Sequence, residues 1–327
     1  MSEPMVLDRY RPVALVGVDA SVNAEFWQAT DSALRRDVGL AVLRRTGERG
    51  ERERAAAMLA QAARWGTFEH FGCARLLDVV GDVPGDVLGP VPGAVPGAVL
   101  GPVLGGGTGF GRSGLPADLI GLTITEWVPG SSLAETLAAG PRHTGDALQM
   151  LDTLARAAET AHRTGLALGC SHPSRIRFDP EGAARQAFAL PAPDSAPADD
   201  VRGLGATLYA LLTGYWPLRC AEAEFSGLPA APRDAQGMVA PPETLRMGLS
   251  MEVSALTMAA LGAGATDAGM HTAAAVHTML VELAADERGP APGAHGHTSA
   301  GLRLNQWATA CRALRGRLLS GANRTGR

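Results

Sequence analysis

DVRGLGATLYALLTGYWPL, residues 200–218, is the stretch of sequence that says most about the fold. Apolar residues recur in it at helical spacing, namely Val201, Leu204, Leu208, Leu211 and Leu212. Gly214 follows the last of them, where a glycine commonly ends a helix. The pattern predicts a helix that begins at Asp200 and ends at Gly214.

The sequence before this helix changes from strand patterns to helix patterns. Short apolar runs at 13–16, 26–29 and 38–43 are separated by turn-like residues and predict an antiparallel meander. Residues 51–63 lack Gly and Pro and predict a helix. Further strands are expected at 74–80 and 119–126, and helices at 147–162 and after Thr272, which suits an N-cap. The order predicts an α+β chain, with a β-rich lobe followed by a helical lobe.

Residues 81–114 interrupt the β-rich part with repeated Val-Pro-Gly and Leu-Gly-Pro triplets. Proline removes hydrogen-bond donors and glycine costs backbone entropy, so we expect an inserted loop without regular structure. The literal G-x-G-x-x-G at Gly109–Gly114 follows this low-complexity sequence and not a strand. That context does not favour a phosphate-binding loop.

Composition excludes several classes of protein. All 29 basic residues are arginine, so no mechanism that needs a lysine is available. The formal net charge of -4 gives no electrostatic case for binding nucleic acid. No apolar run of about 18 residues predicts a membrane span, and the acidic N-terminus does not resemble a signal peptide. Four dispersed cysteines suit a reduced, cytoplasmic protein.

Four stretches, in order, resemble the protein kinase fold: 26–43, 124–133, 161–165 and 200–218. The closest resemblance is to the pseudokinase domain attached to MviN/MurJ-type lipid II flippases of actinobacteria. It implies a bilobal kinase-like fold with an N-terminal extension at 1–6, an N-lobe at 7–126, a C-lobe at 127–284 and a tail at 285–327. The sequence leaves open whether the domain stands alone or is a fragment of a flippase.

The resemblance also assigns positions to the catalytic parts of a kinase, and unsuitable residues stand at them. Asp19, Ser21 and Ala24 occupy the three glycine positions of the phosphate-covering loop. Ala41 stands where the phosphate-binding lysine is expected. Without that lysine, Glu51 or Glu53 is expected to be only a solvated surface charge.

The catalytic loop and the metal ligands are altered in the same way. Cys170 replaces the catalytic aspartate, and Arg175 replaces the magnesium-binding asparagine, although an arginine can contact a phosphate directly. Phe188 falls at the position of the D-F-G aspartate, and residues 190–200 leave no room for an activation loop. The resemblance therefore implies no metal and no cofactor.

These losses predict a catalytically inactive kinase-like domain that serves as a protein-binding or regulatory scaffold. The family implies a role in peptidoglycan synthesis at the inner face of the plasma membrane. It also implies as partner a forkhead-associated domain protein that recognises phosphothreonine, or a Ser/Thr kinase that phosphorylates this chain. The alternative is a divergent Ser/Thr kinase-like protein that retains nucleotide binding or weak phosphotransfer through Arg175. A Cys170–His172 nucleophile is a lesser alternative, because no third orienting group is visible.

The tail carries its own pattern. Leu304, Trp307, Cys311, Leu314 and Leu318 recur at three- and four-residue spacing among several arginines. Such a basic amphipathic helix can lie on an anionic membrane. Packing on the C-lobe or on a partner is the commoner use of such a stripe.

Overall fold

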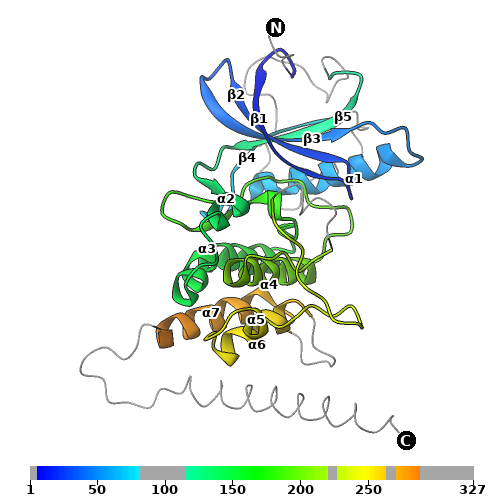
Figure 1. Cartoon of the computed structure of the whole chain (residues 1–327). Helices are drawn as coiled ribbons and strands as arrows, with labels where there is room; N and C mark the ends of the chain where they lie inside the picture. Colours follow the sequence, from blue (N-terminus) through cyan, green and yellow to red (C-terminus); the bar gives the residue numbers. More distant parts are fainter. Residues whose placement is uncertain (1–5, 82–114, 220–226, 263–269, 288–327) are drawn as a thin grey trace, which may run out of the picture.

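Five antiparallel strands form the upper lobe in Figure 1. The computed structural model describes residues 6–81, 115–219, 227–262 and 270–287. The strands are ordered β1-β2-β3-β5-β4, and β1 to β3 form the predicted meander. Their bounds are β1 Tyr10–Asp19, β2 Ala24–Asp31, β3 Arg36–Arg44, β4 Leu76–Gly81 and β5 Leu119–Glu126.

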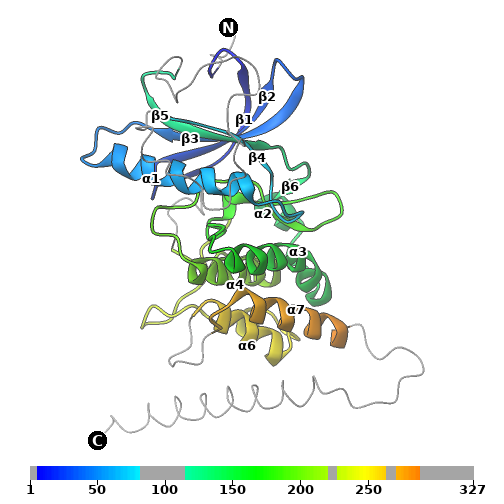
Figure 2. The same cartoon turned by 180° about the vertical axis from the view of Figure 1, so that it is seen from behind.

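Helix α1 (Glu51–Arg64) covers one face of this sheet and continues into the short helix η1 (Trp65–Thr67). Figure 2 shows α1 lying across β3, β4 and β5. Its side chain Leu59 is fully buried and approaches Gly121 of β5 so closely that a Cβ there would stand 2.5 Å from Leu59 Cδ1. A glycine in the strand therefore lets helix and sheet pack closely.

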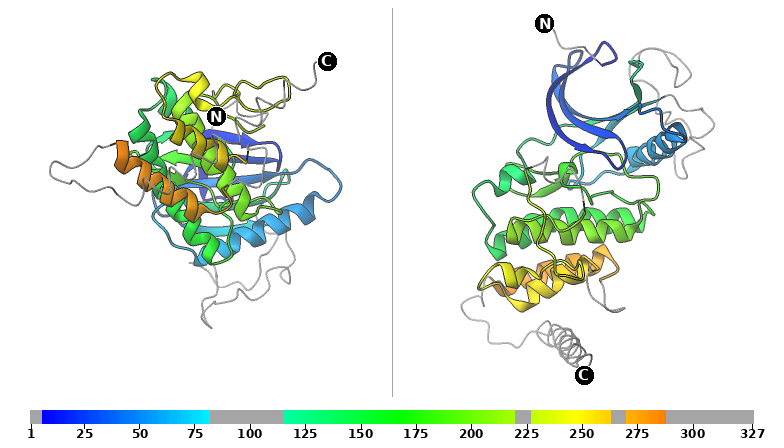
Figure 3. Two further views of the ribbon diagram at one scale, coloured as in Figure 1. Left: turned by 90° about the horizontal axis from the view of Figure 1, so that it is seen from below. Right: turned by 45° about the vertical axis from the view of Figure 1, so that its right-hand side comes forward.

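The lower lobe is mainly helical. Figure 3 shows α3 and α4 side by side above α6 and α7. A small sheet of three short strands, in the order β6-β7-β8, lies between these helices and the upper lobe. The elements are β6 Ser131–Ser132, α2 Leu133–Leu137, α3 Thr144–Arg163, η2 Pro173–Arg175, β7 Ile176–Phe178, β8 Ala184–Gln186, α4 Pro197–Thr213, α5 Pro242–Leu245, α6 Met251–Ala260 and α7 Ala273–Glu287.

Helix α4 is the predicted helix of residues 200–213, and it lies in the core of the lower lobe. All five of its periodic apolar residues are buried. It ends at Gly214, whose φ of 82° is left-handed, as the glycine signal predicted. It begins three residues earlier than predicted, because Pro197 suits the first turn of a helix.

Several predictions concern residues outside those described. Of the insertion predicted at 81–114, Gly81 instead ends β4, and the rest of it, with its G-x-G-x-x-G motif, belongs to this group, as does the tail beyond Glu287. Helix α7 runs to Glu287, three residues past the expected C-lobe boundary. In the described part of the chain, no helix combines the length and apolar character needed to cross a membrane.

Candidate functional site

The two lobes touch where the end of β1 meets the turn η2. A Cβ atom built on Gly17 would stand 2.1 Å from the Oγ of Ser174, a separation that Cβ atoms do not adopt. Only glycine therefore fits at position 17 without a shift of one lobe. By the kinase resemblance, the phosphate-covering loop lies above this contact and the catalytic loop below it. The contact thus lies between the two segments that the resemblance places on either side of a kinase cleft.

A buried ion pair crosses the cleft beside this contact. Arg175 Nη2 lies 2.8 Å from Asp19 Oδ2, and the two side chains retain 3% and 6% of their exposure. Arg175 Nη1 also donates to the Gly169 carbonyl at 3.2 Å, and the guanidinium lies 5.4 Å from the centre of the Phe26 ring. Buried charges need several such partners, because desolvation costs several kcal/mol per ion. The pair joins two positions that the sequence marked as degenerate separately.

Asp19 is held in its ionised form. Burial alone would raise the pKa of this carboxyl, but Arg175, His172 and the hydrogen bond from Ser21 together hold the pKa below its ordinary 3.8. The backbone N–H of Ser21 also donates to Oδ1 at 3.2 Å. A carboxylate fixed here would repel a polyanionic triphosphate.

Apolar side chains fill the rest of the cleft. Ala24 and Phe26 of β2, Ala41 of β3 and Phe188 belong to one buried cluster. The rings of Phe26 and Phe188 are 4.9 Å apart at their centres, and each side chain is fully buried. Ala41 pairs with Phe26 on β2 and with Thr123 on β5. The expected positions of the lysine and of the D-F-G aspartate therefore lie inside an apolar core.

The loop beneath the cleft is organised by Asp200 at the start of α4. Its fully buried carboxylate accepts hydrogen bonds from the backbone N–H groups of Leu168, Gly169 and Cys170, at 2.6, 2.7 and 3.1 Å. His162 Nε2 lies 2.9 Å from Oδ2. A Cβ on Gly203 would stand 2.5 Å from the Cys170 carbonyl oxygen, so α4 packs directly on the loop. The backbone of this loop is therefore held by Asp200 and α4, whichever side chains the loop carries.

Cys170 is placed poorly for nucleophilic catalysis. It is fully buried, its Sγ points to the Asp200 carbonyl at 3.5 Å, and burial together with Asp200 raises the pKa of its thiol well above the ordinary value. His172 instead accepts a hydrogen bond from the Ser174 N–H through Nδ1, at 3.2 Å. Neither observation favours the Cys170–His172 pair considered from the sequence.

Arg177 of β7 binds the segment that connects the lobes, a role that no sequence pattern predicted. Its Nε donates to the Val128 carbonyl at 2.9 Å and its Nη2 to the Gly130 carbonyl at 2.6 Å. The guanidinium lies over the Trp127 ring, 4.3 Å from its centre. Burial lowers the pKa of Arg177, and Glu135 opposes this shift. Two carbonyls of the connecting segment, those of Val128 and Gly130, therefore already accept hydrogen bonds within the protein.

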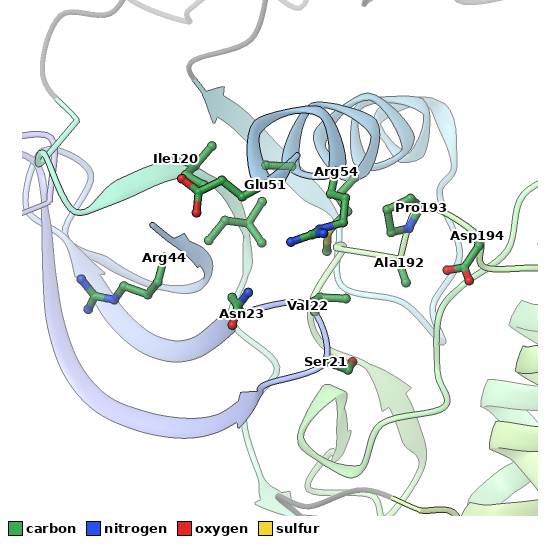
Figure 4. A pocket seen from close by; sticks show the side chains of 13 residues that line it. Ser21, Val22, Asn23, Arg44, Glu51, Arg54, Ile120, Ala192, Pro193 and Asp194 are labelled. Atoms are coloured by element: carbon green, nitrogen blue, oxygen red, sulfur yellow. The ribbon is translucent and has the colours of Figure 1, made fainter. Parts of the chain in front are cut away.

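A cavity of about 440 Å³ opens beside α1, outside the filled cleft (Figure 4). Its walls include Val22, Met58 and Ile120, with Ser21 at the β1–β2 turn. Both arginines at its rim are already paired: Arg44 with Glu25 and Asp118, and Arg54 with Glu48. This cavity offers a ligand mainly an apolar wall.

Glu51 corrects one expectation. It lines the cavity beside α1, but it is not a free surface charge, because its carboxylate accepts hydrogen bonds from the backbone N–H groups of Thr46 and Gly47, both at 2.8 Å. These bonds lower the pKa of Glu51 and tie the start of α1 to the loop that follows β3.

The structure brings most of the predicted positions together. Asp19, Ala24, Ala41, Arg175 and Phe188 lie in or around the closed cleft. Ser21 lies at its edge, and Cys170 lies below it, against Asp200. Among the described residues, no group of three or more His, Cys, Asp or Glu side chains is arranged to hold a metal ion.

Comparison with known proteins identifies the architecture. No family model matches the sequence. The crystal structure of Rad53 1-466 in complex with AMP-PNP aligns with a TM-score of 0.53 and 13% sequence identity, covering 83% of this chain. The fold is that of a protein kinase. At this identity the likeness concerns the kinase-like fold alone, and the aligned region spans 65% of the Rad53 chain.

Proposed function

We propose that this kinase-like chain is a catalytically inactive domain that acts as a protein-binding scaffold. The observation that carries the proposal is the buried ion pair between Asp19 and Arg175. A magnesium ion needs oxygen ligands and a triphosphate needs cations, and at this point the cleft holds a guanidinium already neutralised by a carboxylate. No lysine exists anywhere in the sequence to replace it.

The packing supports the same proposal. A nucleotide would have to displace Phe26 and Phe188 from the core and separate Gly17 from Ser174. It would also compete with Arg177 for two carbonyls of the segment between the lobes. Each change exposes buried apolar surface or leaves a buried polar group unpaired, and both are unfavourable.

The assignment to cell-wall synthesis rests on the resemblance to the MviN/MurJ-associated pseudokinase domain. On the same resemblance, we propose that the partner is a forkhead-associated domain protein. This partner would bind after a Ser/Thr kinase phosphorylates a threonine of this chain. A phosphothreonine adds about -1.5 to -2 charge and strong acceptor oxygens, which suit an arginine-lined recognition site.

Two assays on the full chain test the proposal. In the first, incubation with γ-labelled ATP, Mg²⁺ and an acceptor protein should transfer no label above that seen with heat-denatured chain. Metal-dependent transfer that disappears in the Arg175→Ala variant would instead establish the divergent kinase.

The second assay measures binding of a purified forkhead-associated domain before and after treatment of the chain with a Ser/Thr kinase. We expect binding only after treatment, and loss of binding when the modified threonine is replaced by alanine. Equal binding in both samples, or none in either, would contradict the proposed partner without restoring catalysis.

A further inference from the structure

A second cavity, of about 430 Å³, lies in the lower lobe between α3 and the β7–β8 turn. Its walls come from Ser131 of β6, from Thr136 near the end of α2, from the first two turns of α3 and from the turn at residues 179–183. Thr136 and Met150 contribute polar and apolar surface, respectively. These walls differ from those of the closed cleft and of the cavity beside α1.

Most of the charged side chains that line this cavity are acidic. Asp146, Asp179 and Glu181 line it, against the single cation Arg142. Arg142 is directed to the protein itself, since its Nη2 donates to the Thr136 carbonyl. Asp146 and Glu181 are exposed, so they remain accessible to a ligand. The lining therefore favours a cationic ligand.

Asp179 supplies a second, independent sign of a ligand. Its side chain is 6% exposed, and its Oδ1 accepts a hydrogen bond from the Ala183 N–H at 2.8 Å. Its Oδ2 is buried, and none of the described residues donates a hydrogen bond to it. A buried carboxylate oxygen without a donor is costly, and a guanidinium that donates to it would lower that cost.

The described part of the chain ends beside the helical turn that contributes Asp146 to this cavity. Glu287, the last residue of α7, lies beside the first turn of α3: a Cβ built on Gly145 would stand 3.8 Å from Glu287 Cβ. Gly145 adjoins Asp146, which lines the cavity. The following 40 residues, 288–327, contain seven arginines and no Asp or Glu. A cationic segment thus begins next to an acidic cavity.

We propose that the tail segment 303–318 docks in this cavity, with an arginine directed to Asp179, Asp146 or Glu181. Single exposed arginine–carboxylate pairs contribute only about 0–1 kcal/mol, too little to hold a free peptide. A tethered segment needs far less, because a short linker gives it an effective concentration on the order of millimolar. Tethering therefore favours the chain's own tail over a separate basic protein.

The absence of lysine allows a specific cross-linking test on the full chain. Single variants Arg312→Lys and Arg315→Lys each introduce one side-chain amine, which a carbodiimide can join to a carboxylate in direct contact. We expect amide bonds to Asp146 or Glu181 within one molecule, identified by peptide mass. The matched control is Arg327→Lys, which lies beyond the proposed segment and should give a yield several-fold lower.

Three results would overturn the proposal. The amides could spread over acids of the upper lobe such as Glu48 and Asp118, or isotope mixing could show that they join separate molecules. Alternatively, the introduced amine could react with no acid of the cavity while the chain sediments with phosphatidylglycerol vesicles, which would make the tail a membrane-binding segment.

A charge-reversal experiment tests the same contact without cross-linking. In the Asp146→Arg/Glu181→Arg variant, amide hydrogen exchange in residues 303–318 should become several-fold faster. Adding Arg312→Glu and Arg315→Glu should restore slow exchange. The control reversal Glu48→Arg/Asp118→Arg should leave the tail unaffected, and unchanged melting temperatures would show that all variants fold. Equal exchange in all four proteins would contradict the docking.

Discussion

Arg175 and Asp19 lie 156 positions apart in the chain, yet their side chains form a 2.8 Å ion pair that joins the two lobes inside the cleft. Both are nearly inaccessible to solvent. In a kinase, the same region must stay open to admit ATP and magnesium. Here the ion pair and the packed rings of Phe26 and Phe188 fill it.

Removing one partner of this pair should destabilise the protein strongly. The Asp19→Asn variant leaves the buried Arg175 charge without its counter-ion, so we expect the free energy of unfolding to fall by about 3 kcal/mol. Urea denaturation measures this change. The control Asp118→Asn breaks the exposed pair with Arg44 and should cost less than about 1 kcal/mol.

Replacing both partners should restore most of that loss. Well-packed apolar residues often substitute for a buried ion pair without cost, so Asp19→Leu/Arg175→Met should be more stable than Asp19→Asn. If Asp19→Leu/Arg175→Met is less stable than Asp19→Asn, the ion pair stabilises the fold by more than the mutual neutralisation of its two charges.

The same carboxylate should shape the dependence of stability on pH. The pKa of Asp19 is lowered in the folded chain, so its contribution to stability is present above its ordinary value of 3.8 and is lost as the pH falls through the folded pKa. The pKa values of Asp31 and Glu135 are also lowered, so the pH dependence of the wild-type protein alone does not report on Asp19. The difference in stability between wild type and Asp19→Asn should be largest near pH 7 and narrow below pH 3.8. A constant difference would be contrary to this account.

Gly17 should be sensitive to a single methyl group. In Gly17→Ala the new Cβ would overlap the Ser174 side chain, so we expect a loss of about 1–3 kcal/mol. In a Ser174→Gly background the overlapping atoms are gone, and the same change should cost little. Gly145→Ala lies in α3, and its new Cβ would meet only Glu287 Cβ of α7 at an ordinary 3.8 Å, so this control should be neutral or slightly stabilising.

Cys73 and Cys170 should resist alkylation. Both are buried, and burial raises the pKa of each thiol, so little thiolate forms at pH 8. Iodoacetamide followed by peptide mass analysis should label neither residue in folded protein and both in urea. Rapid labelling of Cys170 in the folded chain would instead support the hypothesis that Cys170 and His172 form a nucleophilic pair.

Local patterns allowed much of the fold to be predicted. The apolar spacing of residues 201–212 and the terminal Gly214 predicted helix α4, because both signals lie within one segment. The meander followed from three apolar runs in the same way. Residues 82–114 and the tail beyond Glu287 are outside the described structure, so their predictions stay open.

The filled cleft could not be predicted, because it depends on contacts between distant segments. In the sequence, Asp19 and Arg175 were interpreted as two independent replacements of kinase residues. A kinase fold places these two positions on opposite sides of the cleft, so their opposite charges were a signal that could have predicted the ion pair. Arg177 carried no such signal, since its partners are backbone carbonyls that exist in every sequence. The role of Asp200 could not be predicted for the same reason, because its carboxylate accepts hydrogen bonds from backbone N–H groups of Leu168 and Gly169.

The most direct test of the closed cleft is a calorimetric titration of the full chain with ATP, with and without Mg²⁺. The Asp19–Arg175 pair and the buried Phe26 predict no heat of binding and no Mg²⁺-dependent rise in melting temperature. A saturable, Mg²⁺-dependent signal that is abolished by Arg175→Ala would contradict the account, because it would place the nucleotide where the structure places the ion pair.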